Sequence, residues 1–147
     1  MIYRVLVVDD YEPWRRFICS TLQQTSNWQV VGEVVDGVDA VHAARTLRPD
    51  LILVDVGLPT LNGIEAARRI LTHDPCCRIL FVSEHRSQDI VKAAFDSGGC
   101  GYIVKSHAGR DLMPAMQAIV DGQSYVSPEL TEDLQTSTRE GARRHGS

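Results

Sequence analysis

The stretch LILVDVGLP, residues 51–59, decides the fold. Its first four residues are aliphatic, which is typical of a strand that is buried on both faces in a parallel sheet. Asp55 follows this strand directly and places an ionisable side chain at its carboxyl end. Because burial of an unpaired charge is strongly unfavourable, a carboxylate in this position indicates a functional site rather than packing.

Two further apolar runs end in charged residues in the same way. Residues 5–8 are followed by Asp9 and Asp10, and residues 102–104 are followed by Lys105. If these runs are parallel neighbours in one sheet, their carboxyl ends share an edge, and ligand sites in open parallel sheets lie outside that edge. The pattern therefore predicts that three acidic side chains and one basic side chain meet in one place.

Five apolar runs along the chain are each followed by a stretch of helical period. The runs are residues 3–8, 29–35, 51–54, 78–82 and 101–104. The stretches repeat apolar residues at the i, i+3, i+4 spacing of an amphipathic helix. Asp36, Asn62 and Ser87 supply candidate N-terminal caps for three of these helices. Five such units in series predict right-handed crossovers and an α/β fold, a doubly wound open sheet of five parallel strands.

The size and composition of the chain exclude several classes of protein. With 147 residues the chain is long enough for one domain with its own core. The net charge of -4 disfavours nucleic-acid binding, which uses basic surfaces. No apolar stretch approaches the roughly 20 residues that span a bilayer. The N-terminus lacks the pattern of a signal peptide, so we expect a cytoplasmic protein that does not bind membranes.

The cysteine and histidine residues show no metal-binding pattern. None of the four cysteines forms a Cys-x-x-Cys pair, and no histidine lies beside them at metal-finger spacing, which favours free thiols. The five histidines have no partner at ligand spacing. His85 and His107, near the predicted site, are therefore interpreted as exposed loop residues.

The chain changes character after Gly122. Residues 1–122 carry the five strand–helix units and form the predicted domain, whereas residues 123–147 begin with a turn and a short extended exit. Apolar residues are scarce from about Glu132 onward. We therefore expect the segment to end in a flexible tail or the stub of a linker.

Taken in order, these motifs resemble the receiver domain of two-component response regulators. The motifs are VVDD at residues 7–10, LVDVGLP at 53–59, Asn62-Gly63, Ser83 and GYIVK at 101–105. The resemblance extends over residues 2–122. It implies a flavodoxin-like (βα)5 fold with a five-stranded parallel sheet in the order 2-1-3-4-5.

The resemblance also implies roles for the acidic cluster. Asp55 would accept a phosphoryl group. Asp10 and Asp55 would bind Mg²⁺ or Mn²⁺ directly, together with the backbone carbonyl of Gly57, and Asp9 would contact the ion mainly through water. Hard oxygen ligands and retained waters suit such an ion.

Residues around the acidic cluster receive roles from the same resemblance. Lys105 and Ser83 would bind phosphoryl oxygens after transfer. Tyr102 would switch between an outward and an inward position, although packing explains a tyrosine in a strand equally well. Glu84 stands where a small or apolar residue is common, and we expect it to alter the lifetime of the phosphorylated state. Gly57 leaves the mouth of the pocket open to small phosphodonors.

Each of these residues has a simpler explanation when it is taken alone. Asp9 or Asp10 could cap the first helix. Asp55 could begin a turn, and Ser83 could cap one. Lys105 could be a solvated strand end. Together these explanations require several coincidences at the ends of the correct strands, so one shared site is the better interpretation.

The end of the predicted domain resembles one subgroup of receivers. Ser106 follows the lysine, where many receivers have proline, and residues 121–128 read DGQSYVSP. Both features are similar to receivers of the NarL/FixJ subgroup, which precede a LuxR-type helix-turn-helix domain. We therefore expect a fragment of a transcription regulator whose DNA-binding output domain is absent from this chain, so that the chain itself does not bind nucleic acid.

The predicted function is a phosphorylation switch, not a turnover enzyme. A histidine kinase or a phosphotransfer protein would supply the phosphoryl group to Asp55. The added charge would shift an equilibrium between two arrangements. The face formed by the fourth helix, the fifth strand and the fifth helix would then form a homodimer or release the output domain.

Three other functions are left open at this point. A stand-alone or degenerate receiver would act as a protein-docking module. A hydrolase with an aspartyl nucleophile usually has a second aspartate at the position of Gly57. A flavodoxin-like cofactor binder would need a loop that cradles phosphate after the first strand, where the acidic residues 9–12, DDYE, would repel it.

Overall fold

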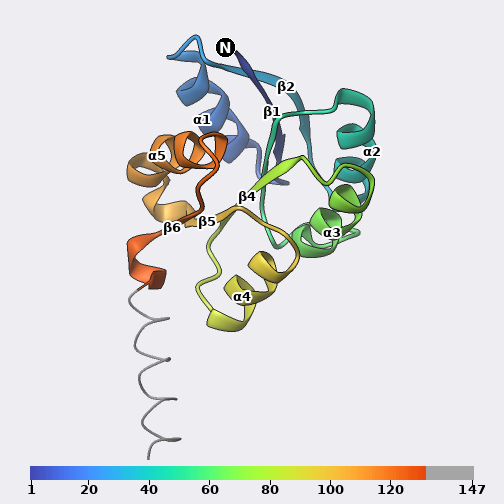
Figure 1. The fold of residues 1–147 in the computed structure, drawn as a ribbon, viewed down its shortest axis with the longest axis vertical. Helices are drawn as coiled ribbons and strands as arrows, with labels where there is room; N and C mark the ends of the chain where they lie inside the picture. The colour runs from blue at the N-terminus through green and yellow to red at the C-terminus, as the bar shows by residue number, and fades with distance from the viewer. Residues whose placement is uncertain (132–147) are drawn as a thin grey trace, which may run out of the picture.

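The computed structural model describes residues 1–131, and these form a parallel sheet with helices on both faces (Figure 1). The strand order is β2-β1-β3-β4-β5-β6, and every neighbouring pair is parallel. The strands are β1 (Tyr3–Val8), β2 (Trp28–Val34), β3 (Leu51–Val54), β4 (Arg78–Ser83), β5 (Gly101–Val104) and β6 (Tyr125–Val126). The α/β doubly wound fold is therefore as predicted.

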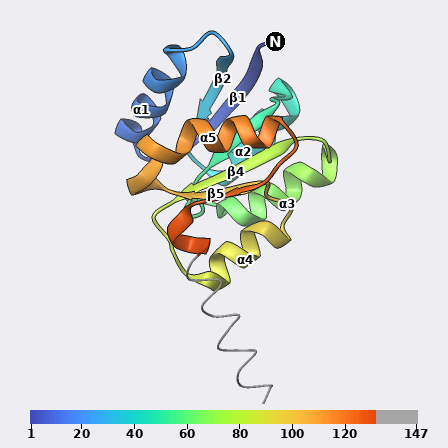
Figure 2. The same cartoon turned by 60° about the vertical axis from the view of Figure 1, so that its left-hand side comes forward.

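Five α-helices connect the strands and cover the two faces of the sheet. They are α1 (Glu12–Gln23), α2 (Gly37–Leu47), α3 (Gly63–His73), α4 (Gln88–Asp96) and α5 (Ala108–Val120), with a short 3-10 helix, η1 (Lys105–His107), before the last. Helices α1 and α5 lie on one face, and α2, α3 and α4 lie on the other (Figure 2). The side chains of Asp36 and Asn62 cap α2 and α3 by accepting backbone N–H groups, as the sequence predicts.

The central strands of the sheet are buried on both sides, which explains why β3 and β5 are continuously apolar. Along β1, Val5 and Val7 pack against α1 and α5, whereas Leu6 and Val8 pack towards α2. Each side chain that is fully buried in this way contributes about 1.5–3 kcal/mol to folding. Two cores thus hold the central strands in place, and their carboxyl ends form a fixed edge.

The sheet has six strands where the sequence predicted five. The sixth, β6, is two residues long and pairs with the outer edge of β5, so it is too short to show an apolar or alternating pattern. The packed structure continues past Gly122, because Ser127 and Leu130 are buried. The predicted flexible tail from Glu132 onward lies outside the described residues.

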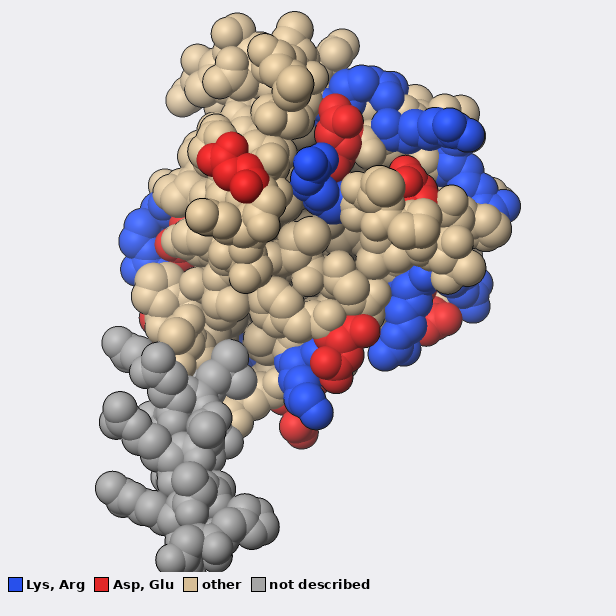
Figure 3. Space-filling model, viewed as in Figure 1, with Lys and Arg blue, Asp and Glu red and all other residues tan. Residues whose placement is uncertain are grey.

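Charged side chains of both signs are present on the face shown in Figure 3, and several basic ones adjoin one another at its upper right. Within residues 1–131, no helix has both the length and the apolar composition needed to cross a membrane.

Candidate functional site

The predicted acidic cluster forms at the carboxyl edge of the sheet. Strands β1 and β3 are adjacent, with Val8 opposite Val54, so Asp9 and Asp55 emerge side by side. The backbone N–H of Asp55 donates to the carbonyl of Val8 over 3.1 Å, which fixes this register. Carboxylate oxygens of Asp9, Asp10 and Asp55 lie within 4.8 Å of one another. The convergence that the sequence predicts is therefore present in the fold.

The three carboxylates differ in exposure. Asp9 is 1% exposed and Asp10 is exposed, while the side chain of Asp55 is 12% exposed. Burial raises the pKa of Asp9 above its ordinary value, although Lys105 and the backbone N–H of Tyr11 oppose this shift. Asp55, between the two extremes, is partly shielded but can still be reached from solvent.

None of these aspartates caps the first helix. Helix α1 is preceded by Tyr11, which makes no side-chain capping bond. Asp9 does have a local structural role, because its Oδ1 accepts the backbone N–H of Tyr11 at 2.9 Å. Its other oxygen, Oδ2, is buried and makes no contact with regular hydrogen-bond geometry, although Lys105 Nζ lies 2.6 Å away. Lys105 is thus the cation that compensates this buried oxygen.

Lys105 reaches the cluster from the end of β5, two strands away from β3. Its Nζ lies 2.6 Å from Asp9 Oδ2 and 3.2 Å from Asp55 Oδ2, and it is 5.3 Å from the centre of the Trp14 ring. Burial lowers the pKa of Lys105, but the carboxylates of Asp9 and Asp55 raise it by more, so the net shift is upward. The lysine is therefore charged and offsets part of the negative charge.

The chemistry of this donor set fits a hard divalent cation. Three carboxylates face one ammonium group, which leaves an excess of negative charge and several free oxygen lone pairs. Mg²⁺ prefers such oxygen ligands and retains some of its waters, and the exposure of Asp10 leaves room for them. The donor set of the acidic cluster therefore fits Mg²⁺.

Ser83 and Tyr102 lie beside the cluster on the next two strands, and both are fully buried. The Ser83 hydroxyl accepts the backbone N–H of His85 at 3.2 Å. The Tyr102 hydroxyl donates to the backbone carbonyl of His85 at 2.7 Å, and its ring packs near Phe81. Burial raises the pKa of Tyr102, so the hydroxyl stays protonated and able to donate. Tyr102 is therefore in an inward position, tied to the loop that follows β4.

A comparison with protein families identifies the family in which this arrangement of acidic and basic residues occurs. A family model described as "Response regulator receiver domain" matches residues 5–117. This chain belongs to the response regulator receiver domain family. The match contains the whole acidic cluster, Ser83, Tyr102 and Lys105.

Relatives of this receiver confirm the predicted subgroup. Response regulator GacA of Pseudomonas aeruginosa is 32% identical over 131 residues, which are 89% of this chain and 61% of GacA. Response regulator protein VraR of Staphylococcus epidermidis is 32% identical over 142 residues, 97% of this chain and 68% of VraR. A crystal structure of a two-component response regulator of the LuxR family, from Aurantimonas sp. SI85-9A1, has a TM-score of 0.90 at 30% identity, and the match covers 94% of this chain and 99% of that one. The receiver thus spans less than two thirds of the length of relatives such as GacA.

His85 was expected near this receiver site as an exposed loop residue, but its contacts there were not predicted. Its side chain is exposed as expected, but its ring Nε2 lies 3.6 Å from the point where a Cβ on Gly57 would stand. Its backbone also contacts Ser83 and Tyr102. The sequence feature that could have indicated these contacts is the place of His85 two residues after Ser83, in the loop that follows β4. Glu84, in the same loop, is exposed.

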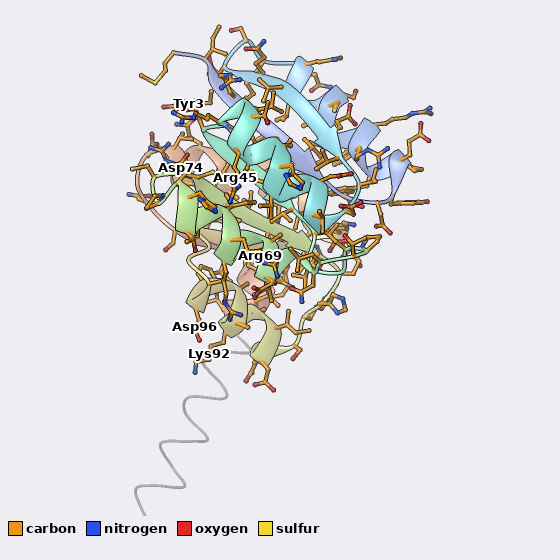
Figure 4. The ribbon with its side chains drawn as sticks, turned by 90° about the vertical axis from the view of Figure 1, so that its right-hand side faces the viewer. Tyr3, Arg45, Arg69, Asp74, Lys92 and Asp96 are labelled. Carbon is orange, nitrogen blue, oxygen red and sulfur yellow. The ribbon has the colours of Figure 1, made fainter. Side chains whose placement is uncertain are left out.

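A well-formed hollow on the described part of the receiver lies away from this site. It has a volume of about 450 Å³ and lies between the C-terminal ends of α2 and α3, on the side shown in Figure 4. Its lining includes the side chains of Arg45 and Asp74. These helix ends lead into the amino ends of β3 and β4, so the hollow lies at the edge of the sheet opposite Asp55.

Proposed function

We propose that this receiver is a phosphorylation switch in which Asp55 accepts a phosphoryl group from a histidine kinase or a phosphotransfer protein. A carboxylate oxygen of Asp55 forms the new P–O bond while the P–N bond of the phosphohistidine donor breaks, and the product is an acyl phosphate. The observation that carries the proposal is the convergence of Asp9, Asp10, Asp55 and Lys105 at one edge of the sheet.

The residues of the chain have separate tasks in this switch. Asp10, Asp55 and the backbone carbonyl of Gly57 would hold Mg²⁺ or Mn²⁺ directly, and Asp9 would act mainly through water. When bound, the ion supplies positive charge that offsets repulsion between the carboxylates and the incoming phosphoryl group. Lys105, already 3.2 Å from Asp55, holds a phosphoryl oxygen of the product.

Buried residues then transmit the change. Ser83 donates its hydroxyl proton to a phosphoryl oxygen after transfer, and a shift of its side chain towards that oxygen also moves the atom that now accepts the backbone N–H of His85. Tyr102 contacts the same residue. Movement of this loop therefore alters the support for Tyr102, and this supports a role for the face formed by α4, β5 and α5 in the switch.

Incubation with Mg²⁺ and acetyl phosphate, followed by intact-mass measurement, tests the proposal. We expect one phosphate-sized mass gain in the wild-type chain and none in Asp55→Asn, because the amide cannot form an acyl phosphate. Asp96→Asn, the same change at an exposed position in α4, is the control and should gain the group normally. No gain in the wild type, or an equal gain in Asp55→Asn, would remove Asp55 from this role.

We expect Glu84 to shorten the lifetime of the phosphorylated state. A carboxylate beside the pocket repels the phosphoryl anion and can hold an attacking water, and both effects favour hydrolysis. Because exposed charges contribute about 0.2–1 kcal/mol, Glu84→Ala should lengthen the half-life of the acyl phosphate by about threefold. Decay of the phosphorylated mass after removal of the phosphodonor measures this, and equal half-lives would show that Glu84 has no such role.

In the proposal, the receiver controls further steps in the intact regulator. In the proposal, the phosphorylated receiver controls homodimerisation or a DNA-binding output domain, as the LuxR-family relative suggests. The protein works in the cytoplasm as a signalling phosphoacceptor and not as a turnover enzyme. The match to only 61% of GacA supports a further domain in the intact protein.

A further inference from the structure

The segment that leaves the domain, residues 125–131 and called the exit segment below, is hydrogen-bonded to β5. The backbone N–H of Ser127 donates to the carbonyl of Tyr102 at 3.0 Å. The hydroxyl of Ser127 accepts the backbone N–H of Val104, also at 3.0 Å. Ser127 is fully buried, so both bonds are shielded from water. The exit segment is thus attached to the strand residue that immediately precedes Lys105.

A buried carboxylate on α5 holds the exit segment in this position. Asp111, 1% exposed, accepts the Ser127 hydroxyl through Oδ2 at 2.8 Å and the Tyr125 hydroxyl through Oδ1 at 2.9 Å. Arg110 pairs with Asp111 and also with Glu129, at 2.7 Å. Arg110 and then the two hydroxyls keep the pKa of Asp111 below its ordinary value, despite burial. The exit segment is therefore held by charged hydrogen bonds, which are stronger than neutral ones.

The same segment shares the apolar core of the switch face. Leu130 is 2% exposed and belongs to the core cluster that contains Tyr102 and Phe81 from the sheet and Val91 from α4. The exit segment therefore contacts β5 through hydrogen bonds and the α4 side through packing. Any change in the position of β5 must also change the contacts of the exit segment.

We propose that the exit segment is part of the phosphorylation switch, with the Asp111–Ser127 pair coupling it to Lys105. This inference rests on the proposed function. A phosphoryl group on Asp55 that is held by both Lys105 and Ser83 fixes the ends of β5 and β4. Because Val104 is bonded to Ser127, a fixed β5 strengthens the hold on the exit segment. Such coupling is reciprocal, so a weaker hold on the exit segment lowers the affinity for a phosphoryl mimic.

Hydrogen exchange with and without Mg²⁺ and beryllofluoride, a phosphoryl mimic, tests the coupling. We expect exchange in residues 125–131 of the wild type to slow by about fivefold with the mimic, the lower end of typical allosteric couplings. In Ser127→Ala this slowing should disappear, and the affinity for beryllofluoride should fall by a similar factor. The ratio between the two states is the readout, because a merely structural role would change exchange equally in both.

Two further variants make the test specific. Asp121→Asn changes an exposed carboxylate at the C-terminal end of α5, where it accepts from Gln117, and should behave as the wild type does. Tyr125→Phe removes one bond to Asp111 and keeps the ring, so it should show a smaller loss of coupling and serves if Ser127→Ala does not fold.

The outcomes separate this inference from the proposed function. If acetyl phosphate produces no mass gain, the proposed function itself fails. If the chain is phosphorylated but exchange in the exit segment is the same with and without the mimic, only the coupling is overturned. Unchanged or higher affinity for beryllofluoride in Ser127→Ala would overturn it as well.

Discussion

Replacement of Gly63 by alanine is expected to destabilise the domain by about 3 kcal/mol, at the upper end of overpacking effects. Gly63 begins α3, and a Cβ there would lie 2.0 Å from the backbone carbonyl oxygen of Asp55. The N–H of Gly63 also donates to the carbonyl of Val56 at 2.8 Å. The start of α3 therefore presses directly on the backbone of the acceptor, and the added methyl group must displace one of them.

The same substitution should slow phosphorylation. A shift of about 1 Å in a reacting group can reduce a rate by about a hundredfold, so loss of the Asp55 position should lower the rate with acetyl phosphate by one to two orders of magnitude. Denaturant unfolding and the rate of mass gain measure the two effects. The phosphorylation rate must be measured under conditions in which the Gly63→Ala variant is still folded.

Gly109 provides a matched control in α5. A Cβ there would meet no atom within 4 Å. Alanine is the better helix former by about 1 kcal/mol, so Gly109→Ala should stabilise the domain slightly and leave phosphorylation unchanged. If Gly63→Ala were as stable as Gly109→Ala, the close approach of α3 to Asp55 would not constrain the site.

The predictable part of the structure is the part that depends on periodic burial. Strands β1, β3 and β5 have the predicted bounds because both of their faces are covered, which requires continuous apolar residues. The meeting of Asp9, Asp55 and Lys105 follows, because the carboxyl ends of parallel strands share one edge. Strand β4 lies between β3 and β5, and Lys105 reaches Asp55 across it because the lysine side chain is long.

The parts of the structure that were not predicted depend on single contacts, which leave no periodic pattern in the sequence. Strand β6 is held by two residue pairs with β5, and no pattern in two residues distinguishes a strand from a loop. The bonds of Ser127 to Asp111 and Val104 join residues 16 and 23 positions apart. Such contacts arise only after the sheet and α5 have formed, so neither propensity nor spacing indicates them.

Removal of the Lys105 charge is expected to have the second large effect. Lys105→Met keeps much of the apolar side chain but leaves buried Asp9 beside Asp55 and Asp10 without an ammonium group. Loss of one partner from a buried ion pair destabilises a protein by about 3–5 kcal/mol. Since Lys105 is 14% exposed and Asp55 is 12% exposed, we expect a smaller loss of about 2 kcal/mol in the absence of divalent cations.

Mg²⁺ should restore part of this loss. The lysine and the divalent cation both compensate the same three carboxylates, so without Lys105 the cluster should bind Mg²⁺ more tightly. Binding to the folded state alone raises its stability by mass action. Urea unfolding with and without Mg²⁺ should therefore show a larger stabilisation by the ion in Lys105→Met than in the wild type.

Lys92→Met separates this effect from a general loss of positive charge. Lys92 is exposed on α4 and points away from the domain (Figure 4), so its replacement should change stability by less than about 0.5 kcal/mol. Its response to Mg²⁺ should equal that of the wild type. Equal stabilisation by Mg²⁺ in Lys105→Met and Lys92→Met would contradict the view that lysine and cation share one acidic cluster, because it would mean that the ion binds beyond the reach of Lys105.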